Sequence, residues 1–256
     1  MIHPTAKTRE FKSKSKKIII LFHGYTGSPT DFNGLGEYLH KKYKVNVLIP
    51  LLKGHGKTLD ELISVKYDDF ISQSEKIIKR KLKEGKEIIL GGYSLGGYLA
   101  TEMAAKYPVK CVFTISTPYK LRFPFNFKPI KILKFFKKKW KKAIRQEKYE
   151  FLINNKCFVY RYLPSSGIDI LYRGVRSTRK LSKKINVPML LISPVKDIFG
   201  KVEGMYKFTS KTPTPRIHER VIIYNSNYHD ILFSPHKEKI FLEISKFLEK
   251  QGLVQR

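Results

Sequence analysis

The strongest constraint on the fold is an alternation between two kinds of segment. Short apolar runs rich in β-branched residues alternate with stretches that carry apolar residues at helical spacing. This pattern predicts βαβ units and a mostly parallel sheet flanked by helices. With 256 residues, 42% of them hydrophobic, the chain can close a sizeable core. The expected strands are 17–22, 45–49, 87–91, 111–115, 189–193 and 220–224, and the expected helices are 31–42, 67–84, 95–106, 205–209 and 237–250.

The alternation breaks once, in a segment with its own composition. Residues 118–182 are rich in Lys, Phe, Tyr and Ile and fall between two expected strands. We therefore predict a core formed by 1–117 and 183–256, with 118–182 as an inserted helical cap over one edge of the sheet. Within the insertion, apolar residues recur near helical spacing with lysines between them, at Ile132, Phe136, Trp140 and Ala143 or Ile144.

The stretch LGGYSLGGYLA places Ser94 in the pattern G-x-S-x-G. Five residues of this kind are a weak signal alone, but here an apolar run, EIIL, precedes them and an expected helix follows. That strand, turn and helix setting is what a nucleophile elbow requires. Glycines at 92 and 96 avoid collisions where strand and helix approach closely, and they let a strained serine project outward. Ser94 is therefore the candidate nucleophile.

A serine nucleophile needs a base, usually an imidazole held by a carboxylate. Asp197 follows the expected strand 189–193, and His229 follows the expected strand 220–224. The resulting chain order of Ser, Asp and His is the order used by hydrolases with such an elbow. Asp197 and His229 are therefore the candidate acid and base.

The other histidines and acids fit these roles less well. His23 and His55 follow early strands beside glycines, where shaping a turn or packing is the expected role. Asp169 lies inside the insertion, and Asp230 is adjacent to the proposed base. The remaining histidines occupy terminal, surface, loop or helix-start positions: His3, His40, His218 and His236.

The chemistry also needs two donors aimed at the oxyanion that forms when Ser94 attacks a carbonyl. The Leu95 N–H, at the start of a helix, supplies one, because amides there are unpaired and the helix dipole favours negative charge. The second donor usually comes from the loop after an early strand. In IIILFHGYTGSP the His23–Gly24 turn would present the Tyr25 N–H.

Five motifs in order carry a family resemblance: HGYTGSPTDF, PLLKGHG, GYSLGGYLA, VPMLLISPVKD and NYHDIL. Together they resemble the α/β-hydrolase superfamily, and most closely its bacterial carboxylesterase and monoacylglycerol lipase group. The resemblance covers nearly the whole chain outside the insertion. It implies an α/β-hydrolase fold with a small cap, a triad of Ser94, Asp197 and His229, and an oxyanion hole made by the Tyr25 and Leu95 backbones.

The resemblance implies a serine carboxylic-ester hydrolase that works through an acyl-serine intermediate, with small-molecule esters as substrates and monoacylglycerols among the candidates. Serine at the elbow disfavours dehalogenase and epoxide hydrolase chemistry, which use a carboxylate there. The alternatives are an acyltransferase or thioesterase with the same triad, and a lipid- or polyanion-binding protein on a hydrolase scaffold. No cofactor and no metal is expected. Two departures from the group concern the substrate: Tyr228 stands where Gly commonly precedes the histidine, and the cap is longer and more basic.

The chain is strongly basic, with 51 Lys and Arg against 21 Asp and Glu and a net charge of +30. Residues 119–184 alone hold 20 basic residues and three acids, a net +17. One interpretation is a lid whose aromatic residues face an acyl pocket while its lysines stay solvated. Another is an interfacial helix that lays Phe135, Phe136 and Trp140 into an anionic membrane. Nucleic-acid binding is disfavoured because no recognised module accompanies the charge, and compositional bias is a further explanation.

Cysteine content and the first residues bear on the compartment. Cys111 and Cys157 give no disulfide framework. The first apolar run, 18–22, is too short for a signal-peptide core or a membrane span. We therefore expect a soluble, cytoplasmic protein, to which the interfacial interpretation of the basic segment would add peripheral contact with anionic membranes.

Overall fold

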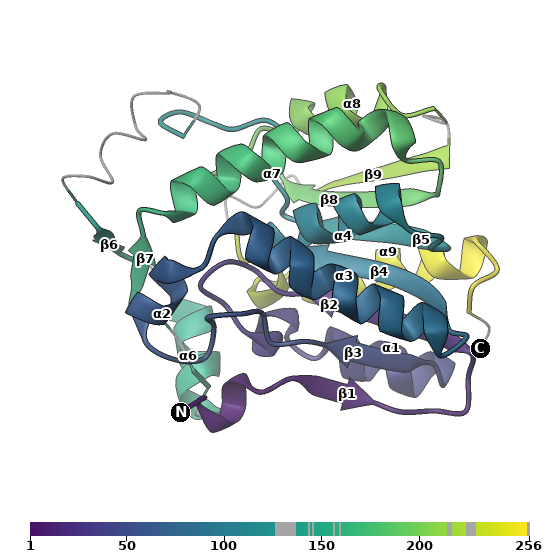
Figure 1. The fold of residues 1–256 in the computed structure, drawn as a ribbon, viewed down its shortest axis with the longest axis horizontal. Helices are drawn as coiled ribbons and strands as arrows, with labels where there is room; N and C mark the ends of the chain where they lie inside the picture. Colours follow the sequence, from purple (N-terminus) through teal and green to yellow (C-terminus); the bar gives the residue numbers. More distant parts are fainter. Residues whose placement is uncertain are drawn as a thin grey trace.

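A mostly parallel sheet organises the chain (Figure 1). The computed structural model describes residues 1–125, 137–142, 144, 146–155, 157–158, 160–213, 217–223 and 229–254. Within these residues seven strands form one sheet in the order β1-β3-β2-β4-β5-β8-β9. Its strands are β1 (Arg9–Phe11), β2 (Lys17–Phe22), β3 (Asn46–Ile49), β4 (Glu87–Tyr93), β5 (Cys111–Ile115), β8 (Met189–Pro194) and β9 (His218–Ile223).

The six expected strands are all present, and they pair in parallel. Tyr224, the last residue of the sixth expected strand, lies outside the described residues. The edge strand β1 was not expected and pairs antiparallel with β3, with Glu10 opposite Leu48. Its three residues, REF, are too short and too exposed to show a strand pattern in the sequence.

Helices cover both faces of the sheet (Figure 1). One buried cluster joins the sheet to α3, α4, α7 and α8, and a second joins the opposite face to α1 and α9. The five expected helices are present with ends shifted by up to four residues. The α-helices in the described residues are α1 (Leu35–Tyr43), α2 (Leu59–Ser64), α3 (Tyr67–Lys83), α4 (Leu95–Lys106), α6 (Gln146–Asn154), α7 (Gly167–Leu181), α8 (Glu203–Thr209) and α9 (Lys237–Lys250).

The first helix starts later than residue 31. Residues Pro29–Phe32 instead form a 3-10 helix, η2, capped by the Ser28 side chain, which accepts from the Thr30 amide. Asn33 (φ 43°) and Gly34 (φ 90°) then take left-handed conformations, which end η2 and reorient the chain before α1 begins. Other short 3-10 helices are η1 (Pro4–Ala6), η4 (Ser182–Lys184) and η6 (Ile231–Phe233).

The helix expected through Trp140 is wrong at that residue. Residues Lys139–Lys141 form a strand, β6, that pairs antiparallel with β7 (Tyr162–Pro164). Lysines exposed on both sides of a half-buried Trp140 also satisfy the two-residue period of a strand. The Trp140 indole N–H donates to Ser165 Oγ at 2.9 Å and so links β6 to the residue that follows β7. The other expected apolar positions Ile132, Phe136 and Ala143 lie outside the described residues, as do Phe135 and Tyr228.

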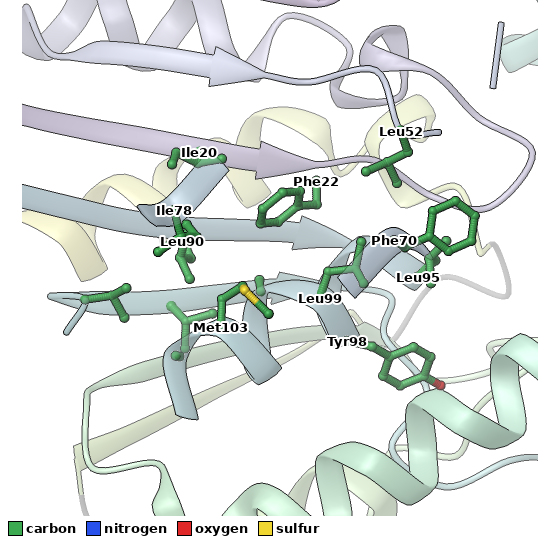
Figure 2. Packing of buried hydrophobic residues seen from close by; sticks show 14 of the residues in the cluster. Ile20, Phe22, Leu52, Phe70, Ile78, Leu90, Leu95, Tyr98, Leu99 and Met103 are labelled. Carbon is green, nitrogen blue, oxygen red and sulfur yellow. The ribbon is translucent and has the colours of Figure 1, made fainter. Parts of the chain in front are cut away.

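The helix α7 packs directly on α4, the helix that follows Ser94. Gly174 of α7 lies so close to the Tyr98 ring that a Cβ atom there would collide with it. Figure 2 shows Tyr98 extending from α4 toward α7, beside a core that includes Phe22, Leu90 and Leu99. None of the helices in the described part of the chain has both the length and the apolar character needed to cross a bilayer.

Candidate active site

Ser94 lies in a sharp turn between β4 and α4. Its φ is 53° and its ψ is −113°, a left-handed conformation that costs a non-glycine residue energy. Its own amide donates to the Ile115 carbonyl at 2.9 Å, which anchors the turn. A Cβ atom on Gly96 would collide with the Phe22 carbonyl, and one on Gly92 would collide with the Gly96 backbone. The two glycines therefore permit the close approach of strand and helix, as the sequence predicts.

The structure brings together the three residues predicted for a triad. His229 Nε2 lies 2.8 Å from Ser94 Oγ, and His229 Nδ1 lies 2.8 Å from Asp197 Oδ2. Because the carboxylate can only accept, Nδ1 donates and Nε2 is left to accept from the serine hydroxyl. The other Asp197 oxygen accepts from the backbone amides of Phe199 at 2.7 Å and Gly200 at 3.1 Å. These bonds hold the carboxylate in one orientation.

The surroundings of His229 favour its charged form. Burial disfavours the imidazolium, but the Asp197 carboxylate outweighs burial and raises the pKa of His229 above its usual value. The rings of Phe199 and Tyr93 contact the imidazole, with centroids at 4.7 and 5.6 Å. The imidazole is thus held by contacts on several sides and can accept a proton next to Ser94.

The amides of Tyr25 and Leu95 are both available near the serine. Neither donates a hydrogen bond to any residue within the described ranges. Leu95 is the first residue of α4, where amides lack intrahelical partners. On the Tyr25 side, the Gly24 amide donates to Asp31 Oδ2 at 3.3 Å and the Gly24 carbonyl accepts from His23 Nδ1 at 2.9 Å. Both neighbouring contacts hold this loop in place.

His23 and His55 lie behind the loop after β2 and contact each other at 4.8 Å between ring centroids. The imidazole of His23 donates to the Gly24 carbonyl and accepts from the Leu52 amide at 3.0 Å. Burial lowers the pKa of His23 to about 4, so the ring is neutral at pH 7. These contacts match the turn-shaping role expected from the sequence.

A cavity of about 630 Å³ opens beside Ser94 and His229. Its walls are mainly apolar, and they come from the segments after β2, β4, β8 and β9 together with residues between 118 and 182. The latter include Phe125, Trp140, Leu163, Ile168 and Leu171. An extended apolar group could therefore lie against these side chains while a carbonyl reaches the serine.

A buried ionic network that no sequence signal indicated lies at one side of this cavity. Lys148 of α6 is 4% exposed and lies 2.9 Å from Asp230 Oδ1 and 3.4 Å from Asp31 Oδ1. The Tyr93 hydroxyl also donates to Asp230, at 2.5 Å. Burial raises the pKa of Asp230, but Lys148 and Lys142 outweigh burial and keep it well below its usual value.

The network links α6 to the loop after β2 and to the loop after β9. Asp31 accepts from the Gly24 amide in the first loop, and Asp230 is the residue after His229 in the second. No sequence signal singled out Lys148, because it is one of 20 basic residues in its region. Among the described residues, no group of three or more His, Cys, Asp or Glu side chains is arranged to hold a metal ion.

Residues 13–236 match the family described as serine aminopeptidase, S33. The chain belongs to this family. A carboxylesterase of Bacillus subtilis (strain 168) is 29% identical over 120 residues, which are 46% of this chain and 48% of that protein. A thermostable monoacylglycerol lipase of Bacillus sp. (strain H-257) is 29% identical over 93 residues, 36% of this chain and 37% of the relative. These matches, each spanning less than half of the relative's length, confirm the resemblance drawn from the motifs.

A solved structure of a metagenome-derived lipolytic enzyme superposes on this chain with a TM-score of 0.82. The superposition covers 98% of this chain and 100% of the other, at 20% sequence identity. At this identity the likeness concerns the fold alone. It confirms the predicted α/β-hydrolase fold, with a mostly parallel central sheet flanked by helices.

Proposed function

We propose that this protein is a serine carboxylic-ester hydrolase, a carboxylesterase or monoacylglycerol lipase-like enzyme, with Ser94, His229 and Asp197 as its triad. The observation that carries the proposal is the continuous hydrogen-bonded chain from Ser94 Oγ to His229 to Asp197, both links at 2.8 Å. The names of the two Bacillus relatives agree with ester substrates.

The geometry supports a two-step mechanism. His229 Nε2 takes the Ser94 proton while Oγ attacks the ester carbonyl, and the Tyr25 and Leu95 amides donate to the resulting oxyanion. Asp197 stabilises the imidazolium, which then gives its proton to the departing alcohol and leaves an acyl-serine. Water, activated by the same histidine, releases the carboxylic acid in the second step.

We further propose that residues 118–182 cap the site and shape its acyl pocket. Trp140, Leu163 and Ile168 from this segment line the cavity, whose volume lies within the range of small-molecule sites. The mainly apolar walls suit a hydrocarbon chain better than a peptide. In the described residues both carboxylates of the cavity that could bind a peptide's α-ammonium, Asp31 and Asp230, are paired with Lys148.

Active-site labelling tests the nucleophile. Incubation with a fluorophosphonate, followed by mass spectrometry of peptides, should show one adduct, on Ser94. Ser94→Ala should abolish labelling, while Ser210→Ala, which removes an exposed serine remote from the triad, should not. Labelling of the folded protein elsewhere, or no labelling, would overturn the proposed nucleophile.

Hydrolysis of p-nitrophenyl esters over a chain-length series tests the reaction, with Ser94→Ala as the blank. We expect activity that depends on acyl length, because the apolar walls contact the chain. Activity equal to the blank for every ester, together with tight lipid binding, would favour the binding-protein alternative. Transfer of the acyl group to an added alcohol in preference to water would favour an acyltransferase, and faster cleavage of the matching thioesters would favour a thioesterase.

A further inference from the structure

Lys142, like Lys148, contributes to the wall of the proposed catalytic cavity. It follows β6 directly, and its backbone amide donates to the Arg161 carbonyl at 2.9 Å. Its Nζ donates to Thr26 Oγ1 at 3.1 Å. Thr26 is the residue after Tyr25, whose amide is a proposed oxyanion donor. The Lys142 ammonium therefore lies beside the loop where the scissile carbonyl is expected to bind.

The charges around Lys142 leave its ammonium without a close carboxylate. Asp31 and Asp230 both lie within salt-bridge distance of Lys148, at 3.4 and 2.9 Å. Over the described ranges, no carboxylate oxygen lies within 4.0 Å of the Lys142 Nζ, and its one side-chain hydrogen bond goes to the neutral Thr26 hydroxyl. An ammonium carries three donors, so two remain for a group in the cavity.

The environment of this ammonium is unfavourable without a partner. Burial and then repulsion from Lys148 lower the pKa of Lys142 to about 8, although Asp230 and Asp31 act in the opposite direction. Lys142 is half-buried, and an ammonium that is partly removed from water is stabilised when an opposite charge pairs with it. A neutral hydroxyl could accept its hydrogen bonds, but only an anion would offset both the desolvation and the repulsion.

We propose that Lys142 is a specificity-determining residue that binds an anionic group, a carboxylate or a phosphate, carried by the ester substrate close to its scissile bond. The proposal rests on the proposed esterase function. It narrows the substrate class to esters that carry one anionic group. That group meets Lys142 at the polar side of the cavity. The remainder of the substrate lies along the apolar walls.

The test compares anionic esters with neutral partners of similar size. One arm places the anion on the alcohol portion, with 1-butyrylglycerol 3-phosphate against 1-butyrylglycerol. The other arm places it on the acyl portion, with mono-p-nitrophenyl glutarate against p-nitrophenyl pentanoate. The measured quantity is the anionic-to-neutral ratio of kcat/KM within each arm, so effects on the triad cancel.

Lys142→Met should lower this ratio by about 10- to 100-fold in one arm, the range expected for hydrogen bonds to a charged group. Lys139→Met is the matched control, because Lys139 lies in β6, three residues before Lys142, is exposed and lies outside the cavity lining. That control should keep the wild-type ratio in both arms.

The wild-type protein gives a second measurement that needs no variant. The ratio should fall as the pH rises from 7 to 9, because Lys142 loses its proton around pH 8. The other charged groups near Lys142 are Lys148, Asp31 and Asp230, with His229 and Lys141 also lining the cavity. Loss of the proton from His229 affects both substrates of an arm alike.

The outcomes distinguish failure of the anion site from failure of the esterase proposal. Hydrolysis of the neutral esters, with ratios that are insensitive to both pH and Lys142→Met, would overturn the anion site and leave the esterase proposal intact. Failure of the wild type to hydrolyse any of the four esters would overturn both. If Lys142→Met does not fold, the wild-type pH dependence decides, and a flat ratio between pH 7 and 9 overturns the anion site.

Discussion

The loops after β2 and β9 each place a histidine near the cavity, His23 fully buried and His229 partly exposed, and the two histidines differ in their partners. Both ring nitrogens of His23 contact backbone groups, the Gly24 carbonyl and the Leu52 amide. The ring nitrogens of His229 contact the Asp197 carboxylate and the Ser94 hydroxyl. Burial lowers the pKa of His23 to about 4, whereas Asp197 outweighs burial and raises that of His229.

The difference shows that burial alone does not decide what a histidine can do. A ring whose nitrogens are both used by the backbone has no site for a transferred proton, so His23 can only fix the loop. A ring with a carboxylate behind it and a hydroxyl in front can take and return a proton.

The largest effect should come from the base. His229→Ala should lower kcat/KM by about 10⁵- to 10⁶-fold, leaving on the order of 10³-fold over water from the oxyanion amides and binding. Ester hydrolysis measures the loss, and thermal unfolding checks that the variant folds. A loss smaller than tenfold would show that another group is the base.

The second effect concerns the carboxylate that distinguishes the two histidines. Asp197→Asn should lower kcat by about 10⁴-fold, because an amide can donate to Nδ1 and stabilise the wrong tautomer of His229. Asp60→Asn, an exposed acid in α2, is the matched control and should keep wild-type turnover. Near-normal turnover in Asp197→Asn would mean that another carboxylate, such as Asp230, orients the base.

The third effect should appear in stability rather than in chemistry. His23→Ala leaves the buried Leu52 amide and Gly24 carbonyl without their side-chain partner, which should cost about 2–4 kcal/mol of unfolding free energy. Urea denaturation measures this cost. A variant with unchanged stability but a 10⁴-fold loss of kcat would show that His23 takes part in the chemistry.

The smallest effect separates the two histidines by pH. The unfolded chain protonates His23 near pH 6.5, whereas the fold resists protonation down to about pH 4. Stability from His23 is therefore complete above pH 6.5 and is lost as the pH falls toward 4, by about 2 kcal/mol at pH 5. The pKa of His229 is raised above 6.5, so this base becomes protonated at a higher pH than an ordinary histidine. We therefore expect kcat/KM to begin to fall above pH 6.5 as the solution is acidified.

Parallel measurements of kcat/KM and urea unfolding between pH 8 and 4 would check this order. Activity should decline first and stability second. A decline of stability that precedes or accompanies the loss of activity would contradict the opposite pKa shifts of the two rings.

The fold and the close grouping of Ser94, Asp197 and His229 could be predicted because their sequence signals are local. The six expected strands of the main sheet contain short apolar runs, and Ser94, Asp197 and His229 lie in the segments that follow three of them. The glycines at 92 and 96 have a steric reason that the structure reproduces. Because parallel strands have their carboxyl ends at the same edge of a sheet, the three segments that carry these residues meet at that edge.

The ionic network and the β6–β7 strand pair could not be predicted, because both depend on contacts between residues far apart in the chain. Lys148 meets Asp31 and Asp230, which are 117 and 82 residues away in the chain. Around Trp140, alternating lysines fit a helix and a strand equally well, and only the pairing with β7 decides. The edge strand β1 likewise depends on its contact with β3.

The packing of α7 on Tyr98 limits how this scaffold can be recombined. Grafting a relative's whole segment in place of 118–182 would remove Gly174 and expose a tyrosine that is otherwise fully enclosed. A chimera that exchanges only the part before α7 would keep this surface covered. The β6–β7 strand pair and α6 are therefore the natural unit to exchange between relatives, whereas α7 should be kept from the recipient chain.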